Sequence, residues 1–385
     1  MDYIKRDIDD QLMGFLRKNK VLLILGPRRV GKTMMLKKFQ DSLDIPYIFV
    51  NGEDISMIDS LKTRTIQNYK NFMGDRKLLI IDEAQHIPDI GMILKLMVDS
   101  IDDIMILATG SSAFDILNKA GEPLTGRKIV KYLYPFSESE FALTEDQFQR
   151  KDNLQDRLVL GSYPELSNYS NRNDKIDYLR DLVNSYLLKD ILVLDGIRNS
   201  SKIYNLLRLV AFQVGSLVSY SELASSVGMS SQTVEKYLDL LSKVFILHNV
   251  QGFSSNLRKE ITKNSKWYFL DNGIRNILAA NMNPIGLRDD LGILWENYVI
   301  SERIKYQLNN NWIGYNFFWR TYDKQEIDWI EQRDGGLYAY EFKWNSNKNV
   351  KIPGAWSKQY PDSSFNVINP SNYFDWVTKD VKIDS

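Results

Sequence analysis

The chain has 385 residues, a length that predicts two or three domains, and its 44% hydrophobic content is sufficient for globular cores. It carries 49 basic and 49 acidic residues, so any surface for nucleic acid must be local. The absence of cysteine excludes disulfides and thiolate metal sites, and the two histidines, His86 and His248, are too few for a histidine-rich metal centre. Catalysis would therefore rest on carboxylates, lysine and metal-bound water.

The N-terminal segment, residues 1–7, contains acids and lacks the apolar core of a signal peptide. Nowhere does an apolar stretch approach the ~20 residues that a membrane-spanning helix requires. We therefore expect a cytoplasmic protein without a membrane partner.

The first motif lies between an apolar run at 21–25 and an amphipathic helix expected from residue 34. It matches the phosphate-binding pattern G-x-x-x-x-G-K-[ST] and reads Gly26-Pro27-Arg28-Arg29-Val30-Gly31-Lys32-Thr33. Strand, loop and helix follow in the order that a P-loop requires. Backbone N–H groups of such a loop bind phosphate at the start of the helix. We expect Lys32 to contact the β- and γ-phosphates of ATP and Thr33 to bind Mg²⁺.

A second buried strand, residues 77–81, ends in Asp82 and Glu83, as in a Walker B motif. Asp82 would hold Mg²⁺ and Glu83 would polarise the attacking water. A third strand, 104–108, leads to Thr109 and Ser111, either of which we assign as a polar sensor near the γ-phosphate, although such residues are also ordinary turn formers. Arg127 is either an arginine finger for a neighbouring subunit or a solvated surface residue.

The pattern becomes helical from 145 to 198, and residues 200–270 resemble a winged helix-turn-helix. Helices are expected at 204–212, 220–228 and 230–241, with wing strands at 244–250 and 267–270. Eight basic residues against four acidic ones between 200 and 266 favour phosphate contact with DNA, although winged helices also serve as protein-interaction or spacer modules. The basic residues are Lys202, Arg208, Lys236, Lys243, Arg258, Lys259, Lys263 and Lys266.

A second group of candidate catalytic residues lies in the C-terminal third of the chain. Glu296 lies in an apolar helix, and Asp328 lies in a strand of a hairpin. Glu341 and Lys343 follow Asp328 by thirteen and fifteen residues, in a third strand. Because side chains alternate along a strand, Glu341 and Lys343 lie on one face of it. This is the arrangement of the PD-(D/E)XK nuclease fold. Asp328 and Glu341 would bind Mg²⁺, Lys343 would orient or deprotonate water, and Glu296 would complete the acidic cluster. The alternative is a cross-strand set of salt bridges on a solvated sheet.

Nearly the whole chain resembles the prokaryotic P-loop ATPases of the AAA+ class that end in a C-terminal domain of unknown function. The residues that carry this resemblance are the P-loop, Ile81-Asp82-Glu83-Ala84-Gln85, Thr109-Gly110-Ser111-Ser112, Gly161-Ser162-Tyr163-Pro164-Glu165, Trp319-Arg320 and Glu341-Phe342-Lys343. Ser162 departs from the second glycine usual in the family. The resemblance implies an ATPase, a winged helix and a nuclease-like domain in one chain.

We therefore expect an α/β fold made of a P-loop ATPase domain at 1–144, a helical connector at 145–199, a winged helix at 200–275 and a nuclease-like domain at 276–385. The predicted function is ATP hydrolysis coupled to DNA binding and metal-dependent DNA cleavage. The alternative is a nucleotide-controlled switch that binds DNA or protein and whose nuclease-like domain is catalytically silent. A finger acting in trans at Arg127 would require a homo-oligomer.

Overall fold

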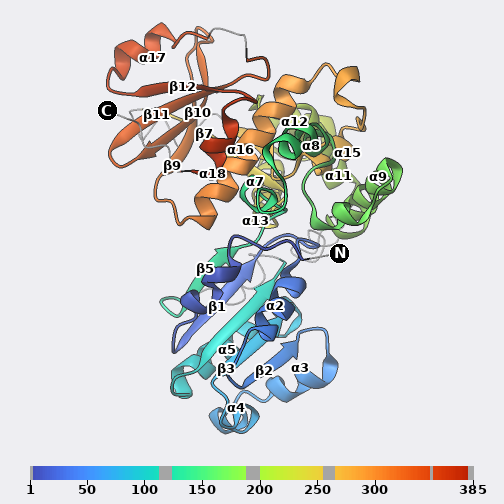
Figure 1. Ribbon diagram of the computed structural model, residues 1–385, viewed down its shortest axis with the longest axis vertical. Coiled ribbons are helices and arrows are strands. Elements are labelled where there is room, and N and C mark those ends of the chain that lie inside the picture. The colour runs from blue at the N-terminus through green and yellow to red at the C-terminus, as the bar shows by residue number, and fades with distance from the viewer. Residues whose placement is uncertain (1–2, 112–123, 188–199, 255–264, 347–349, 380–385) are drawn as a thin grey trace.

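The structure, a computed structural model, describes residues 3–111, 124–187, 200–254, 265–346 and 350–379. The described chain forms two lobes. The N-terminal lobe is drawn in blue and cyan at the bottom of Figure 1, and all that follows lies above it. None of the helices in these residues combines the length and the apolar character needed to cross a membrane.

The N-terminal lobe is built on a parallel five-stranded sheet in the order β2-β3-β4-β1-β5. Its central strands are apolar and fully buried, as expected of a parallel sheet that helices cover on both faces. The strands are β1 (Lys20–Leu25), β2 (Tyr47–Asn51), β3 (Leu78–Asp82), β4 (Met105–Gly110) and β5 (Lys128–Tyr132). The helices are η1 (Asp9–Gln11), α1 (Leu12–Phe15), α2 (Lys32–Asp41), α3 (Ile55–Lys62), α4 (Ile66–Met73), η2 (Ala84–His86) and α5 (Ile90–Ser100).

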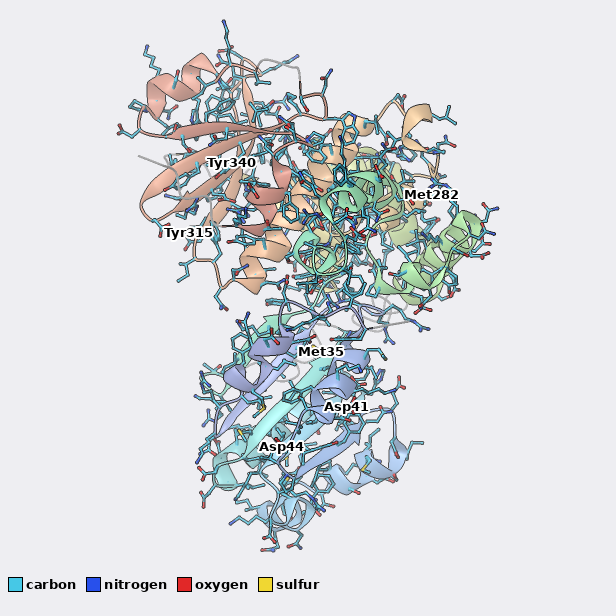
Figure 2. All side chains as sticks on the ribbon, in the orientation of Figure 1. Met35, Asp41, Asp44, Met282, Tyr315 and Tyr340 are labelled. Atoms are coloured by element: carbon cyan, nitrogen blue, oxygen red, sulfur yellow. The ribbon has the colours of Figure 1, made fainter. Side chains whose placement is uncertain are left out.

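Because the strands are parallel, β1, β3 and β4 all end at one edge of the sheet. The register pairs Leu25 with Gly110 and Asn51 with Asp82. The expected P-loop, Walker B acids and polar sensor residues therefore lie together at the edge that faces the upper lobe. In Figure 2, Met35 of α2, the helix that follows the P-loop, lies at that end of the lower lobe.

The upper lobe begins with helices. These are α7 (Glu138–Phe141), α8 (Gln147–Leu160), η3 (Pro164–Asn168), α9 (Arg172–Asp181), the π-helical turn η4 (Leu182–Leu187), α11 (Ser200–Phe212), α12 (Tyr220–Val227) and α13 (Ser231–Lys243). Ser219 and Ser230 cap α12 and α13, and Gly228, in the left-handed region, ends α12. The expected pair of helices around a glycine turn is thus present.

A seven-stranded sheet joins the middle of the chain to its end, in the order β12-β11-β10-β9-β7-β8-β6. Its strands are β6 (Leu217–Val218), β7 (Leu247–Gly252), β8 (Ser265–Phe269), β9 (Tyr315–Arg320), β10 (Glu326–Arg333), β11 (Gly336–Phe342) and β12 (Ser364–Ile368). β7 pairs in parallel with β9, and the N–H of Phe253 donates to the carbonyl of Phe318 at 2.6 Å. The two expected wing strands therefore belong to the same sheet as the C-terminal strands.

The remaining helices are α15 (Asn272–Leu278), η5 (Ile285–Leu287), α16 (Leu291–Asn309), α17 (Gly354–Gln359) and α18 (Tyr373–Thr378). α16 is buried over most of its length, and its Arg303 forms a fully buried ion pair with Glu331 of β10 at 2.6 Å. Tyr340 of β11, labelled in Figure 2, is also fully buried and packs on Trp376 of α18. One apolar core runs through both lobes, and a smaller cluster around Trp319 and Trp356 fills the far side of the second sheet.

Candidate functional site

The loop between β1 and α2 has the conformation that its sequence predicts. Gly31 caps α2 in the left-handed region. A Cβ on Gly26 would lie 1.9 Å from the carbonyl oxygen of Leu133, so only glycine allows this close approach. Lys32 is 4% exposed, and its Nζ donates to the carbonyls of Gly26 and Pro27 at 3.1 and 2.9 Å. The loop therefore folds back over its own lysine at the start of the helix.

Asp82, the last residue of β3, receives two hydroxyl groups. Thr33 donates to its Oδ2 at 2.7 Å and Thr109 donates to its Oδ1 at 2.6 Å. The hydroxyl of Thr33 and the carboxylate of Asp82 are therefore adjacent, and hard oxygens of these kinds are the ligands that Mg²⁺ prefers. Thr109 is fully buried, and its hydrogen bond fixes the orientation of the Asp82 carboxylate. The expected proximity of Thr33, Asp82 and Thr109 is thus present.

Glu83 follows in the left-handed region at φ 50°, which is uncommon for a residue other than glycine. Its Oε1 lies 3.9 Å from Nζ of Lys32, and its backbone N–H donates to Oγ1 of Thr109 at 3.1 Å. The amide of Gln85 donates both to Oε2 of Glu83 and, at 3.1 Å, to Oγ of Ser111. Ser111 is thus linked through Gln85 to Glu83, the predicted Walker B acid, a contact that the sequence did not indicate.

A buried arginine near the N-terminus also supports the loop. Arg6 is 4% exposed, and its guanidinium donates to the carbonyls of Val30 and Tyr134, both at 2.6 Å, and to Oε1 of Glu140 at 2.8 Å. It also lies over the ring of Phe136, 4.9 Å from its centroid. Sequence reasoning missed Arg6 because its partners are far along the chain and no local motif surrounds it.

A cavity of about 590 Å³ opens over the loop and extends to the upper lobe. Such a volume is in the range of nucleotide and cofactor sites. Residues of the N-terminal lobe and the following strand connection form most of its wall: Tyr3, Ile4, Arg6, Arg28, Arg29, Val30, Gly31, Lys32, Thr33, Met34, Glu53, Glu83 and Phe136. The upper lobe contributes Pro164, Glu165 and Asn168 of η3. The cavity therefore lies between the two lobes.

Asp271 stabilises the turn that places Pro164 in the cavity wall. The backbone N–H of Ser162 donates to Oδ2 of Asp271 at 2.7 Å, and the N–H of Phe136 donates to the carbonyl of Ser162 at 2.9 Å. Gly161 has φ +78°, and a Cβ there would lie 2.1 Å from Oδ1 of Asp271. Asp271 follows β8 and caps α15, so the cavity turn is attached directly to the second sheet.

Arg127 lies at the other edge of the first sheet. It immediately precedes β5, and the first residue of β5 pairs with Val21 near the beginning of β1. The Nε of Arg127 donates to Oδ1 of Asp99 at 2.6 Å. The residues that line the cavity do not include it. A role for Arg127 in the nucleotide site of another copy stays a prediction.

The C-terminal acids divide into two groups around lysines. Lys343, one residue beyond β11, lies 2.6 Å from Oε1 of Glu341 and 4.0 Å from Oδ2 of Asp328, which also accepts the backbone N–H of Phe342 at 2.9 Å. Glu296 instead accepts the hydroxyl of Tyr268 at 2.7 Å. The four predicted residues are thus neighbours, but each acid already has a cation or a hydrogen-bond donor.

Lys266 of β8 is the centre of the second group. It is 1% exposed, and its Nζ lies 2.5 Å from Oε1 of Glu326 and 3.8 Å from Oε1 of Glu296. The expectation that Lys266 contacts DNA is therefore wrong, because its ammonium is buried among carboxylates. Arg258, Lys259 and Lys263 lie outside the described residues. On α13 the exposed charged residues are Glu235 and Asp239 as well as Lys236 and Lys243, so this helix carries no net positive charge.

Burial controls the protonation of this region. It raises the pKa of Glu296 to about 7, and the neighbouring Asp328 adds to the increase while Lys266 opposes it. The pKa values of Asp328 and Glu341 are also raised, mainly by burial. Burial disfavours the charged form of Lys266, but Glu296, Asp328 and Glu326 outweigh it and raise the pKa of this lysine. The lysine therefore stays charged at neutral pH.

In the residues that the structure describes, His, Cys, Asp and Glu side chains do not form any group of three or more that could hold a metal ion. The metal-binding roles of Asp328 and Glu341 stay predictions. Sequence reasoning identified Glu296, Asp328, Glu341 and Lys343 but missed Tyr268, Glu326 and the role of Lys266. Alternation within β8 places Lys266 and Tyr268 on one face, which was the available signal.

Comparison with known proteins divides the chain into three matched segments. Residues 18–142 match an AAA domain, residues 151–285 a domain of unknown function (DUF8612), and residues 291–381 another domain of unknown function (DUF4143). The N-terminal lobe is therefore an AAA-type, P-loop ATPase-like domain, as predicted. The predicted C-terminal domain of unknown function is also confirmed, whereas the matches support neither a winged helix nor a nuclease-like fold.

Relatives with similar sequence occur in bacteria and archaea, and all are described as uncharacterized proteins. One from Mycobacterium tuberculosis is 26% identical over 90% of this chain and 75% of its own length. A second, from Haemophilus influenzae, is 25% identical over 89% of this chain and 88% of its own length. A third, from Methanocaldococcus jannaschii, is 24% identical over 95% of this chain and 83% of its own length. A solved signal transduction ATPase with numerous domains (STAND), from Pyrococcus horikoshii, aligns with 80% of this chain and 48% of its own, at 11% identity and a TM-score of 0.29, which supports no argument.

Proposed function

We propose that this protein is a nucleotide-controlled switch that binds and hydrolyses ATP and whose upper lobe responds to the bound nucleotide. The observation that carries the proposal is the cavity over the P-loop, which both lobes line. A ligand in that cavity contacts Lys32 on one side and the η3 segment on the other. Nucleotide binding can then shift the two lobes if its affinity differs between their arrangements.

Each group in the N-terminal lobe has a role in this proposal. Lys32 exchanges its carbonyl partners for phosphate oxygens, and Thr33 and Asp82 hold Mg²⁺, which supplies charge neutralisation when bound. Glu83 accepts a hydrogen bond from the attacking water and polarises it, while Gln85 fixes the orientation of the Glu83 carboxylate. Thr109 does the same for Asp82.

For the C-terminal part we favour a catalytically silent docking role over DNA cleavage. Lys266 places a buried ammonium among Glu296, Glu326 and Asp328, and Lys343 lies between Asp328 and Glu341. A divalent cation would have to compete with these charges. DNA stays a candidate partner of this switch, because the basic segment with Arg258, Lys259 and Lys263 has the charge that phosphate contact needs.

ATP turnover of the full chain tests the proposal. We expect Mg²⁺-dependent hydrolysis that Lys32→Ala abolishes and that Lys37→Ala, a matched change at an exposed lysine of the same helix, leaves intact. Lack of ATP binding by the wild-type protein would refute the proposed function.

The same protein, incubated with duplex, single-stranded and branched DNA, separates the two C-terminal roles. The switch predicts that DNA products are unchanged in Mg²⁺ or Mn²⁺, whether or not ATP is present. Cleavage that Asp328→Ala removes while ATP turnover persists would establish the nuclease function instead. Stimulation of ATP turnover without cleavage would identify DNA as the partner of the switch.

A further inference from the structure

The η3 segment brings two polar side chains into the nucleotide cavity. Glu165 and Asn168 both line it, and both belong to the upper lobe. Within the described part of the chain, no hydrogen bond or ion pair engages either side chain, although most other polar groups at this junction are paired. Arg6, for example, has three partners. Glu165 and Asn168 are therefore available to a ligand.

The wall of the cavity includes apolar surface as well as the phosphate end. Gly31, Lys32 and Thr33 form the start of α2, which is the place for phosphates. Tyr3, Ile4, Phe136 and Pro164 instead provide apolar and aromatic surface. Phe136 is connected to the Pro164 turn through the carbonyl of Ser162. With phosphates on the loop, the heteroaromatic base of a nucleotide fits this apolar wall.

We infer that Glu165, with Asn168 beside it, reads the base of the nucleotide and selects adenine over guanine. This inference rests on the proposed nucleotide-binding function. Adenine presents an exocyclic amino donor where guanine presents a carbonyl acceptor. An ionised carboxylate can only accept hydrogen bonds, so Glu165 accepts one from the amino group of adenine and repels the O6 of guanine. The amide of Asn168 donates to a ring nitrogen.

The surroundings of Glu165 agree with this role. Tyr178 of α9 has a buried hydroxyl without a hydrogen-bond partner in the described structure. Burial raises the pKa of Tyr178, and the charge of Glu165 raises it further while Arg29 of the loop opposes this effect. The charges of Glu165 and of Arg29 thus act on the same hydroxyl group of α9. A base bound to Glu165 would also be in a position to report nucleotide occupancy to α9.

The experiment measures affinities of ATP, GTP, 2′-deoxy-ATP and inorganic tripolyphosphate for the full chain by calorimetry with Mg²⁺. We expect the wild type to prefer ATP over GTP by roughly 10- to 100-fold. Glu165→Gln, which keeps the shape but can donate to O6, should bring this ratio close to one without changing tripolyphosphate affinity. Asn168→Ala should weaken ATP binding, and Glu235→Gln, at an exposed acid of α13, should change nothing.

Three results would overturn the inference. Equal affinities for ATP and GTP in the wild type, or an unchanged ratio in Glu165→Gln, would show that Glu165 does not read the base. A change confined to the ratio between ATP and 2′-deoxy-ATP would assign Glu165 to the ribose instead. Failure of the wild type to bind any of the four probes would refute the proposed function itself, which distinguishes that failure from failure of the inference.

Discussion

Replacement of Lys266 by methionine removes the cation that lies between Glu296 and Glu326 and keeps most of the side-chain volume. The ammonium lies 2.5 Å from Glu326 and 3.8 Å from Glu296, and the lysine is 1% exposed. Loss of one partner from a buried ion pair costs about 3–5 kcal/mol, because the remaining charges are left uncompensated. We therefore expect a loss of this size in the free energy of unfolding at pH 8.

The loss should decrease in acid. The pKa of Glu296 is about 7 with Lys266 in place, and removal of the cation raises it further. Below pH 7 protonation of Glu296 stabilises the wild type and the variant alike, so their stabilities diverge only above pH 7, by about 1.4 kcal/mol for each pH unit. The loss at pH 5.5 should therefore be smaller than the loss at pH 8 by about 1.4 kcal/mol. Urea unfolding followed by tryptophan fluorescence at both pH values measures this difference, with Lys351→Met, at an exposed lysine, as the control. An equal loss at both pH values would refute the proposed charge balance.

Four further substitutions test other parts of the structure. Glu83→Gln should lower ATP turnover by about 10²- to 10⁴-fold while ATP affinity, measured by calorimetry, stays unchanged; a weaker affinity would place Glu83 in binding instead. Thr109→Val removes a hydrogen bond to Asp82 and should raise the Mg²⁺ concentration for half-maximal turnover about 10- to 100-fold, whereas an unchanged requirement would contradict its positioning role. Gly161→Ala should lower the free energy of unfolding by at least about 1–3 kcal/mol through backbone strain and the clash with Asp271, and a neutral result in urea unfolding would count against this geometry. Glu296→Gln should stabilise the protein by about 1–3 kcal/mol at pH 8 and have little effect below pH 4.5, because the raised pKa of Glu296 makes the wild type lose stability as the pH rises from 4.5 to 7; an equal effect at every pH would be inconsistent with this pKa.

The sequence predicts the N-terminal lobe well because its signals are local. The P-loop and the Asp82–Glu83 pair each follow a buried strand, and parallel strands bring their ends together without further information. Thr109 could be placed for the same reason. The contacts of Arg6 could not be predicted, since Glu140 is 134 residues away and only the folded junction brings the two together.

The C-terminal part shows where a local pattern stops being informative. Spacing along the chain correctly indicated that Asp328, Glu341 and Lys343 would be neighbours. It did not indicate that Lys266, sixty-two residues before Asp328, would enter their surroundings on a strand of the same sheet. Charge counting placed Lys266 on the surface, because composition carries no information about which charges are buried.

The pairing of β7 with β9 has a consequence for how this chain can be divided. Two separate family matches meet near residue 290, yet one sheet passes across that boundary, and Phe253 on one side packs against Phe317 and Trp356 on the other. A chimera that exchanges only the last hundred or so residues with a relative would have to rebuild both a strand pair and an aromatic cluster. Residues 151–379 should therefore be exchanged and expressed as one unit, because Asp271 and Asn276 also bind the segment at 158–162.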